Sequence, residues 1–265
     1  MNYIEMDGMR IAYERQGSGP PLVLLHGAFG FDSQSWRRQI DALSDEFTVV
    51  AWDMPGCGQS SDPPENFLAT DYANCLAACI DTLELTQPHV LGLSFGSVLA
   101  LELYRRFPKV PRSLVLASAY AGWVSSLSPE AVEQRRRLIF SSLDLPPEQW
   151  ARQWSPSMLS DKAPPALFEE VEASLSRFHQ EGQRRLIEAF AQQDLRDVLP
   201  HISVPTLLVY GEKDSRSPLN VAHDMHASIP NSRLVVIPDV GHMCNIEAPE
   251  RFNAEVRQFL HSVPK

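Results

Sequence analysis

The sequence predicts an α/β fold in which a mostly parallel sheet is covered by helices on both faces. Short, unbroken Val/Leu runs such as residues 20–27 and 113–119 alternate with segments of helical periodicity. Strands that are buried on both faces read as continuous apolar runs, because helices cover each side of a parallel sheet. The 265 residues are enough for one large α/β domain or two modest ones.

The chain is expected to begin with an antiparallel hairpin, because residues 3–6 and 10–17 flank the turn dipeptide Asp7-Gly8. Six further strands and the helices that connect them then follow in alternation. The expected strands are 20–27, 47–53, 89–94, 113–119, 205–211 and 233–238, and the helices are 33–45, 70–85, 96–107, 219–229 and 249–260. This makes eight strands in all.

Between residues 120 and 195 the alternation stops, and proline-containing breaks separate several predicted helices. Both flanks are needed to complete one sheet, so the inserted helices are interpreted as a lid rather than an independent domain. The predicted organisation is a core of 1–119, a helical cap of 120–195 and the rest of the core in 196–265.

Charge and composition exclude several classes of protein. A net charge of −10 and a pI near 5.3 would repel a phosphate backbone, so nucleic acid is not an expected partner. No apolar run reaches membrane-spanning length and the first residues include acids, so a cytoplasmic protein without membrane contact is expected. His223 and His226 lack a third ligand and are interpreted as exposed helix residues.

The cysteines lack the spacing of a metal finger and are interpreted as small buried side chains in a reducing compartment. Cys244 is the one for which a further role stays open, because it lies two residues after His242. The cysteines are Cys57, Cys75, Cys79 and Cys244.

The stretch "GLSFG" places Ser94 between Gly92 and Gly96, after a predicted strand and before a predicted helix. A sharp strand-to-helix turn exposes the serine hydroxyl at the carboxyl edge of the sheet, where ligands of open α/β sheets bind. The flanking glycines omit Cβ atoms that would collide with neighbouring backbone. The pattern therefore predicts that Ser94 is a nucleophile.

A serine hydroxyl needs a base, and the base needs a carboxylate that orients it. Asp214 follows the predicted strand 205–211, and His242 follows the strand 233–238, which gives the chain order Ser, Asp, His. Asp239 and Glu212 also lie near strand ends and remain alternative acids.

Acyl transfer also needs two N–H donors that face the developing oxyanion. The Phe95 N–H directly follows the nucleophile. The loop "HGAFG" after the strand 20–27 supplies the second, from Ala28 or alternatively from Phe29.

Taken together, the chain resembles the α/β-hydrolase fold superfamily, in its serine esterase, lactonase and cofactor-free haloperoxidase-like branch. The motifs "LLHGAFG", "WDMPGCGQS", "GLSFGS", "VYGEKD" and "GHMCNIEAPERF" occur in the order of that family. The resemblance implies a triad of Ser94, Asp214 and His242, an oxyanion hole of Ala28 and Phe95, and a cap over 120–195. It also implies that Asp53 belongs to a structural turn.

The expected function is hydrolysis of a small carboxylic ester or lactone through an acyl-enzyme on Ser94, without a metal or organic cofactor. Serine at position 94 excludes relatives with an aspartate nucleophile, and Met243 in place of Trp disfavours carbon–carbon bond cleavage. Cleavage of such a bond, a cofactor-free perhydrolase or haloperoxidase activity, and a slow-turnover ligand receptor remain alternatives. The candidate substrate contacts are Phe29, Trp123 and Met243.

Overall fold

The computed structural model describes residues 1–126 and 128–264, and its centre is one eight-stranded sheet with the order β1-β2-β4-β3-β5-β6-β7-β8. β1 and β2 pair antiparallel, β2 joins β4 antiparallel, and the remaining neighbours are parallel. The strands are β1 (Asn2–Met6), β2 (Met9–Gln16), β3 (Pro21–Leu25), β4 (Thr48–Trp52), β5 (His89–Leu93), β6 (Ser113–Ala117), β7 (Thr206–Gly211) and β8 (Ser232–Ile237). The predicted fold class is confirmed.

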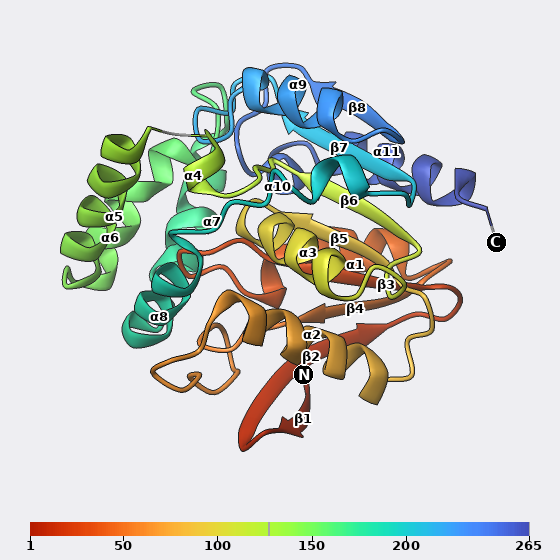
Figure 1. The fold of residues 1–265 in the computed structure, drawn as a ribbon. Coiled ribbons are helices and arrows are strands. Elements are labelled where there is room, and N and C mark those ends of the chain that lie inside the picture. The colour runs from red at the N-terminus through yellow and green to blue at the C-terminus, as the bar shows by residue number, and fades with distance from the viewer. Residues whose placement is uncertain (127, 265) are drawn as a thin grey trace.

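Helices lie on both faces of this sheet (Figure 1). α2 packs against α3 on one face, and α1 packs against α11 on the other. This division follows from right-handed crossovers, because the chain reverses direction across the sheet between β4 and β5. The core helices are α1 (Arg37–Leu43), α2 (Ala69–Thr82), α3 (Phe95–Arg106), α9 (Leu219–Ser228), α10 (Cys244–Glu247) and α11 (Pro249–Ser262).

The helix expected over 33–45 is divided into a short 3₁₀ segment, Ser33–Trp36, and α1. The Asp32 carboxylate accepts a hydrogen bond from the Gln34 N–H at 2.9 Å and caps the first segment. The short helix α10 is absent from the sequence prediction, since one helical turn carries no periodicity.

The described residues of the 120–195 range form helices without a strand, and Figure 1 shows α5 to α8 gathered on the left, beyond one end of the strands. Residue 127 of this range lies outside the described residues, as does residue 265. The segment contains α4 (Trp123–Ser126), α5 (Pro129–Leu143), α6 (Pro147–Trp154), the 3₁₀ turn Ser155–Ser157, α7 (Pro165–Leu175) and α8 (Gln180–Phe190). A further 3₁₀ turn, Leu199–His201, leads back to β7.

α8 meets the loop after β4 through two glycines. A Cβ atom on Gly182 would lie 2.1 Å from the Gly56 carbonyl oxygen, and Gly56 itself has φ +82°. Backbone therefore contacts backbone at this point, and the contact fixes α8 relative to the sheet.

Within the described residues, no helix is both long and apolar enough to cross a membrane.

Gly182→Ala is expected to destabilise the protein, although alanine favours a helix by about 1 kcal/mol over glycine. The new methyl group must displace the Gly56 backbone, and overpacking of this kind costs roughly 1–3 kcal/mol. Urea unfolding measures the change in the free energy of unfolding. Glu188→Ala, an exposed site on the same helix, is the control, and a Gly182→Ala protein as stable as this control contradicts the prediction.

Candidate active site

Ser94 occupies the turn between β5 and α3 in a strained conformation, with φ 52° and ψ −112°. A Cβ on Gly92 would lie 2.4 Å from the Gly96 carbonyl oxygen, and one on Gly96 would lie 2.1 Å from that of Leu25. Both flanking positions thus require glycine. Strain of this size costs about 1–3 kcal/mol and persists mainly at functional sites.

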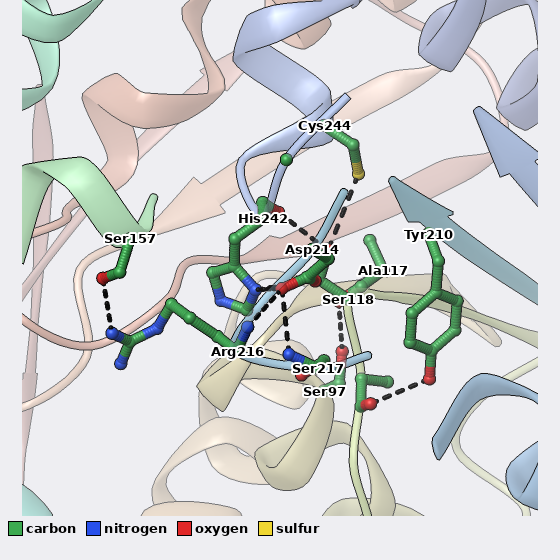
Figure 2. A network of polar contacts seen from close by, with 12 residues as sticks. Ser97, Ala117, Ser118, Ser157, Tyr210, Asp214, Arg216, Ser217, His242 and Cys244 are labelled. Carbon is green, nitrogen blue, oxygen red and sulfur yellow. Dashed lines mark hydrogen bonds and ion pairs between the residues drawn. The ribbon is translucent and has the colours of Figure 1, made fainter. Parts of the chain in front are cut away.

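Asp214 and His242 form a buried pair at the carboxyl ends of β7 and β8. The His242 Nδ1 lies 2.8 Å and 3.0 Å from the two Asp214 carboxylate oxygens, and both residues are at most 4% exposed. An ionised carboxylate only accepts, so Nδ1–H is the donor and Nε2 is left for other chemistry. The N–H groups of Arg216 and Ser217 also donate to Asp214, as Figure 2 shows.

The pKa of Asp214 lies below its ordinary value despite the burial of the carboxyl group. Burial alone would raise this pKa, but the charge of His242, its hydrogen bond and the N–H groups of Ser217 and Arg216 outweigh it. Asp214 is therefore ionised at neutral pH and orients the imidazole.

β6 connects the serine to this pair. The Ser94 N–H donates to the Ala117 carbonyl at 2.8 Å, and the next residue, Ser118, donates its hydroxyl to the His242 carbonyl at 2.7 Å. In the described part of the chain no hydrogen bond joins the Ser94 hydroxyl to the imidazole. Burial raises the pKa of Tyr120, and the nearby Ser94 and Trp123 side chains act against this rise. Catalytic hydrogen bonds are often long before substrate binds.

Phe95 directly follows Ser94, and a Cβ on Gly27, the residue before Ala28, would lie 3.8 Å from the Ser94 Cβ. Among residues 1–126 and 128–264, the Ala28 and Phe95 N–H groups donate no hydrogen bond. Both residues are 3% exposed, and buried N–H groups without a partner are rare in folded proteins. The Phe29 N–H, the alternative donor, is already bonded to the Gln183 side-chain oxygen at 2.8 Å. The arrangement favours Ala28 over Phe29 as the second donor.

The two alternative acids lie away from His242. Asp239 is exposed and pairs with Lys162 at 2.6 Å. Glu212 is exposed and accepts from the Asp239 N–H at 3.0 Å. Of the three carboxylates at these strand ends, Asp214 alone contacts the imidazole among the described residues.

The predicted substrate contacts have different surroundings. The Phe29 ring stacks on Trp154 at 5.2 Å. Trp123 is buried beside Tyr120, and the buried Met243 donates its N–H to the Met158 carbonyl. A cavity of about 320 Å³ nearby is lined by Trp154, Arg216, Arg135, Gln134, Ala131, Leu138 and Ile139. It includes neither Trp123 nor Met243, and their substrate roles stay predictions.

Sequence reasoning missed Tyr120, Arg216 and Gln183. Tyr120 follows β6 and Arg216 follows β7, so the rule that sites form at carboxyl strand ends points to both. Gln183 comes from α8, and nothing in its local sequence connects it with the loop after β3.

The cysteines are all buried thiols. Burial raises the pKa of Cys244 to about 12, so this residue beside His242 carries a neutral S–H group.

Asp53, which was expected to be structural, accepts hydrogen bonds from the Ser33 and Gln59 N–H groups at 2.8 Å each and closes the turn after β4. His223 and His226 are exposed on α9.

A strained serine and a buried Asp–His pair at the carboxyl edge of a mostly parallel sheet define the class of α/β hydrolases. The chain belongs to the alpha/beta hydrolase fold family, whose model matches residues 20–249. The predicted resemblance is confirmed.

Several of the proteins that the chain is similar to are named as hydrolases or esterases. It is 29% identical to the putative carbamate hydrolase RutD of Cronobacter turicensis over 93% of this chain and 92% of the relative. It is 30% identical to the (E)-2-((N-methylformamido)methylene)succinate hydrolase of Acinetobacter baylyi, covering 95% and 94% of the two chains. A malate-bound thermophilic esterase from Thermogutta terrifontis matches with 30% identity and a TM-score of 0.92 over 100% of both chains.

Proposed function

We infer that the protein is a serine hydrolase that cleaves small carboxylic esters or lactones. The observation that carries this proposal is the strained Ser94 at the same sheet edge as the buried Asp214–His242 pair. The unpaired N–H groups of Ala28 and Phe95 support it, because a tetrahedral oxyanion needs two such donors.

In the proposed reaction the His242 Nε2 accepts the Ser94 proton while the serine oxygen bonds to the substrate carbonyl carbon. The carbonyl oxygen becomes an oxyanion that the Ala28 and Phe95 N–H groups stabilise. When this intermediate collapses, the carbon–oxygen bond breaks and His242 protonates the leaving alcohol. His242 then takes a proton from water while the water oxygen bonds to the acyl carbon. The bond between that carbon and the Ser94 oxygen breaks, His242 returns the proton to the serine oxygen, and the acid is released.

The number of substrate molecules cleaved per protein molecule distinguishes the proposed enzyme from a slow ligand receptor with the same triad. The wild-type protein is mixed with a large molar excess of p-nitrophenyl acetate or p-nitrophenyl butyrate. The amount of nitrophenol released per mole of protein is then measured over time. Sustained multiple turnover is expected. Release that stops after one equivalent contradicts the proposal and indicates a receptor.

A second candidate is hydrolysis of a carbon–nitrogen bond. The names of two relatives refer to a carbamate and to an N-methylformamido group. The same serine, base and oxyanion donors can cleave amides and carbamates if His242 protonates the leaving nitrogen. A parallel assay with p-nitroanilide and carbamate substrates compares kcat/KM between the two bond types.

The helices of residues 120–195 are proposed to form a cap over the site. α8 supports this, because its Gln183 binds the Phe29 N–H in the loop that also contains Ala28. A lid of this kind controls access and desolvation more than the chemical step.

Trp123→Ala is expected to change acyl selectivity, because the indole is buried and both Trp123 and Ser94 lie close enough to act on the pKa of Tyr120. Turnover of hexanoyl and aryl esters should fall by roughly 10-fold or more, while acetyl ester turnover falls far less. The measurement is kcat/KM along an acyl series with one leaving group. The Trp154→Ala variant, which enlarges the adjacent cavity, is measured on the same series for comparison. If Trp123→Ala changes kcat/KM by the same factor for every acyl group, Trp123 packs the structure and does not select the substrate.

A further inference from the structure

Arg135 and Arg216 line the same cavity of about 320 Å³, and Arg216 lies two residues after Asp214 in the chain. Across the described residues, neither guanidinium forms an ion pair with a carboxylate: Arg216 donates to Ser157, and Arg135 lies over the Trp123 ring. Their surroundings differ from those of Arg136 and Arg137, which both pair with Glu133 on the same helix, α5. Two unpaired arginines thus meet in one cavity of a chain with a net charge of −10.

The Arg216 side chain is held from several sides. Its guanidinium carbon lies 4.9 Å from the Phe29 ring centroid and 5.4 Å from that of Trp154, and Nη1 donates to the Ser157 hydroxyl at 2.9 Å. Figure 2 shows the side chain directed away from Asp214 toward Ser157. Nε and Nη2 have no partner in the described part of the chain, and their rigid planar fork is oriented for an anion.

The two cations oppose each other electrostatically. Burial, followed by repulsion from Arg135, lowers the pKa of Arg216 to about 10, so the group stays charged at neutral pH. Tyr120 and Asp214 are the groups that favour its charge, and the Asp214 carboxylate is bonded to His242. A partly desolvated charge without a counterion raises the free energy of the folded protein. An anion bound between Arg216 and Arg135 would offset this unfavourable electrostatic free energy.

Tyr120 connects this cavity with the nucleophile. The charges of Arg135 and Arg216 and the side chains of Trp123 and Ser94 all act on the pKa of its hydroxyl, so the arginines and the serine lie close to the same phenol group. Arg135 also stands 5.6 Å from the centroid of the Trp123 ring. Phe29, beneath Arg216, directly follows the oxyanion-hole residue Ala28. A group bound by the arginines can therefore belong to the same small molecule whose carbonyl carbon lies at Ser94.

We propose that the cavity binds a carboxylate at the end of the substrate remote from the scissile bond, with Arg216 and Arg135 as the specificity-determining residues. This rests on the proposed function and names its substrate class: half-esters of dicarboxylic acids, or lactones that carry a free carboxylate. A planar two-oxygen group matches the guanidinium fork, and it fits beside the flat faces of Phe29 and Trp154.

The kinetic test compares two esters of equal chain length and equal leaving group, the p-nitrophenyl monoester of glutaric acid and p-nitrophenyl valerate. The wild type is expected to prefer the anionic glutaryl ester. Arg216→Met and Arg135→Met should each lower the glutaryl-to-valeryl ratio of kcat/KM by roughly 10–100-fold, mainly through KM, as expected for a lost charge-assisted hydrogen bond.

Arg152→Met is the matched control, since Arg152 is exposed on α6 and bonds only to a backbone carbonyl among the described residues. It removes the same charge and should keep the wild-type ratio. Equal losses on both esters in the Arg216 and Arg135 variants, or an unchanged ratio, overturn the carboxylate site while the esterase proposal stands. Circular dichroism and Tm identify any variant that fails to fold.

A binding measurement is independent of turnover. Calorimetry with Ser94→Ala protein should detect glutarate, with affinity reduced roughly 10-fold or more when Arg216→Met is added. No glutarate binding, or tighter binding of inorganic phosphate than of glutarate, overturns the inference. If the wild type cleaves no ester, the proposed function fails, and this measurement still decides whether the arginines bind a carboxylate.

Discussion

Ser94→Ala is expected to fold normally and to lose at least ~10⁴-fold in kcat, because it removes the hydroxyl on which the proposed acyl-enzyme forms. The residual rate comes from substrate binding and from the Ala28 and Phe95 N–H groups, which the substitution leaves in place. The strained backbone at position 94 stays, since alanine also carries a Cβ. The measurement is steady-state p-nitrophenyl butyrate hydrolysis beside Tm.

The control for this substitution is Ser141→Ala, which removes an exposed hydroxyl from α5. It should keep full activity. A fluorophosphonate probe, followed by peptide mass spectrometry, should label Ser94 in the wild type and nothing in Ser94→Ala. Labelling of another residue, or an active Ser94→Ala protein, would remove Ser94 from the mechanism.

Asp214→Asn is expected to lower kcat by up to ~10⁴-fold, by analogy with the same change in a serine protease triad, while the protein still folds. The Asp214 carboxylate accepts from His242 Nδ1 at 2.8 Å and from two backbone N–H groups. An amide of the same shape can present its NH₂ group to Nδ1, which favours the wrong tautomer and withdraws the charge that stabilises the imidazolium.

Asp239→Asn and Glu212→Gln are matched controls, because they make the same chemical change at exposed carboxylates of the same sheet edge. Each should change kcat by less than about 3-fold, as exposed groups away from the chemistry do. If Asp239→Asn or Glu212→Gln loses most of its kcat while Asp214→Asn stays active, the acid of the triad is the residue whose substitution causes the loss, and not Asp214.

Local patterns predicted the strands and core helices closely, because each depends on residues near in sequence. β5 was expected over 89–94 and is His89–Leu93, and α3 was expected over 96–107 and is Phe95–Arg106. The glycines around Ser94 are local too, since they permit one sharp turn. The 3₁₀ segment before α1 and the single turn of α10 were missed, because a few residues carry too little periodicity to be recognised.

The sequence by itself therefore determined the layers of the fold, the order of the sheet-forming segments and the position of the strained serine. The family resemblance already implied Asp214 as the partner of His242, and the tertiary structure shows this contact, while Asp239 and Glu212 pair with other groups. The tertiary structure alone placed Gln183 on the Phe29 N–H and left Arg216 and Arg135 unpaired in one cavity. The physical reason is that periodicity and turn chemistry act over a few residues. Which side chains pair at the strand ends depends instead on contacts between segments that are far apart in the sequence. Asp214 and His242 are 28 positions apart, and Phe29 and Gln183 are 154 positions apart.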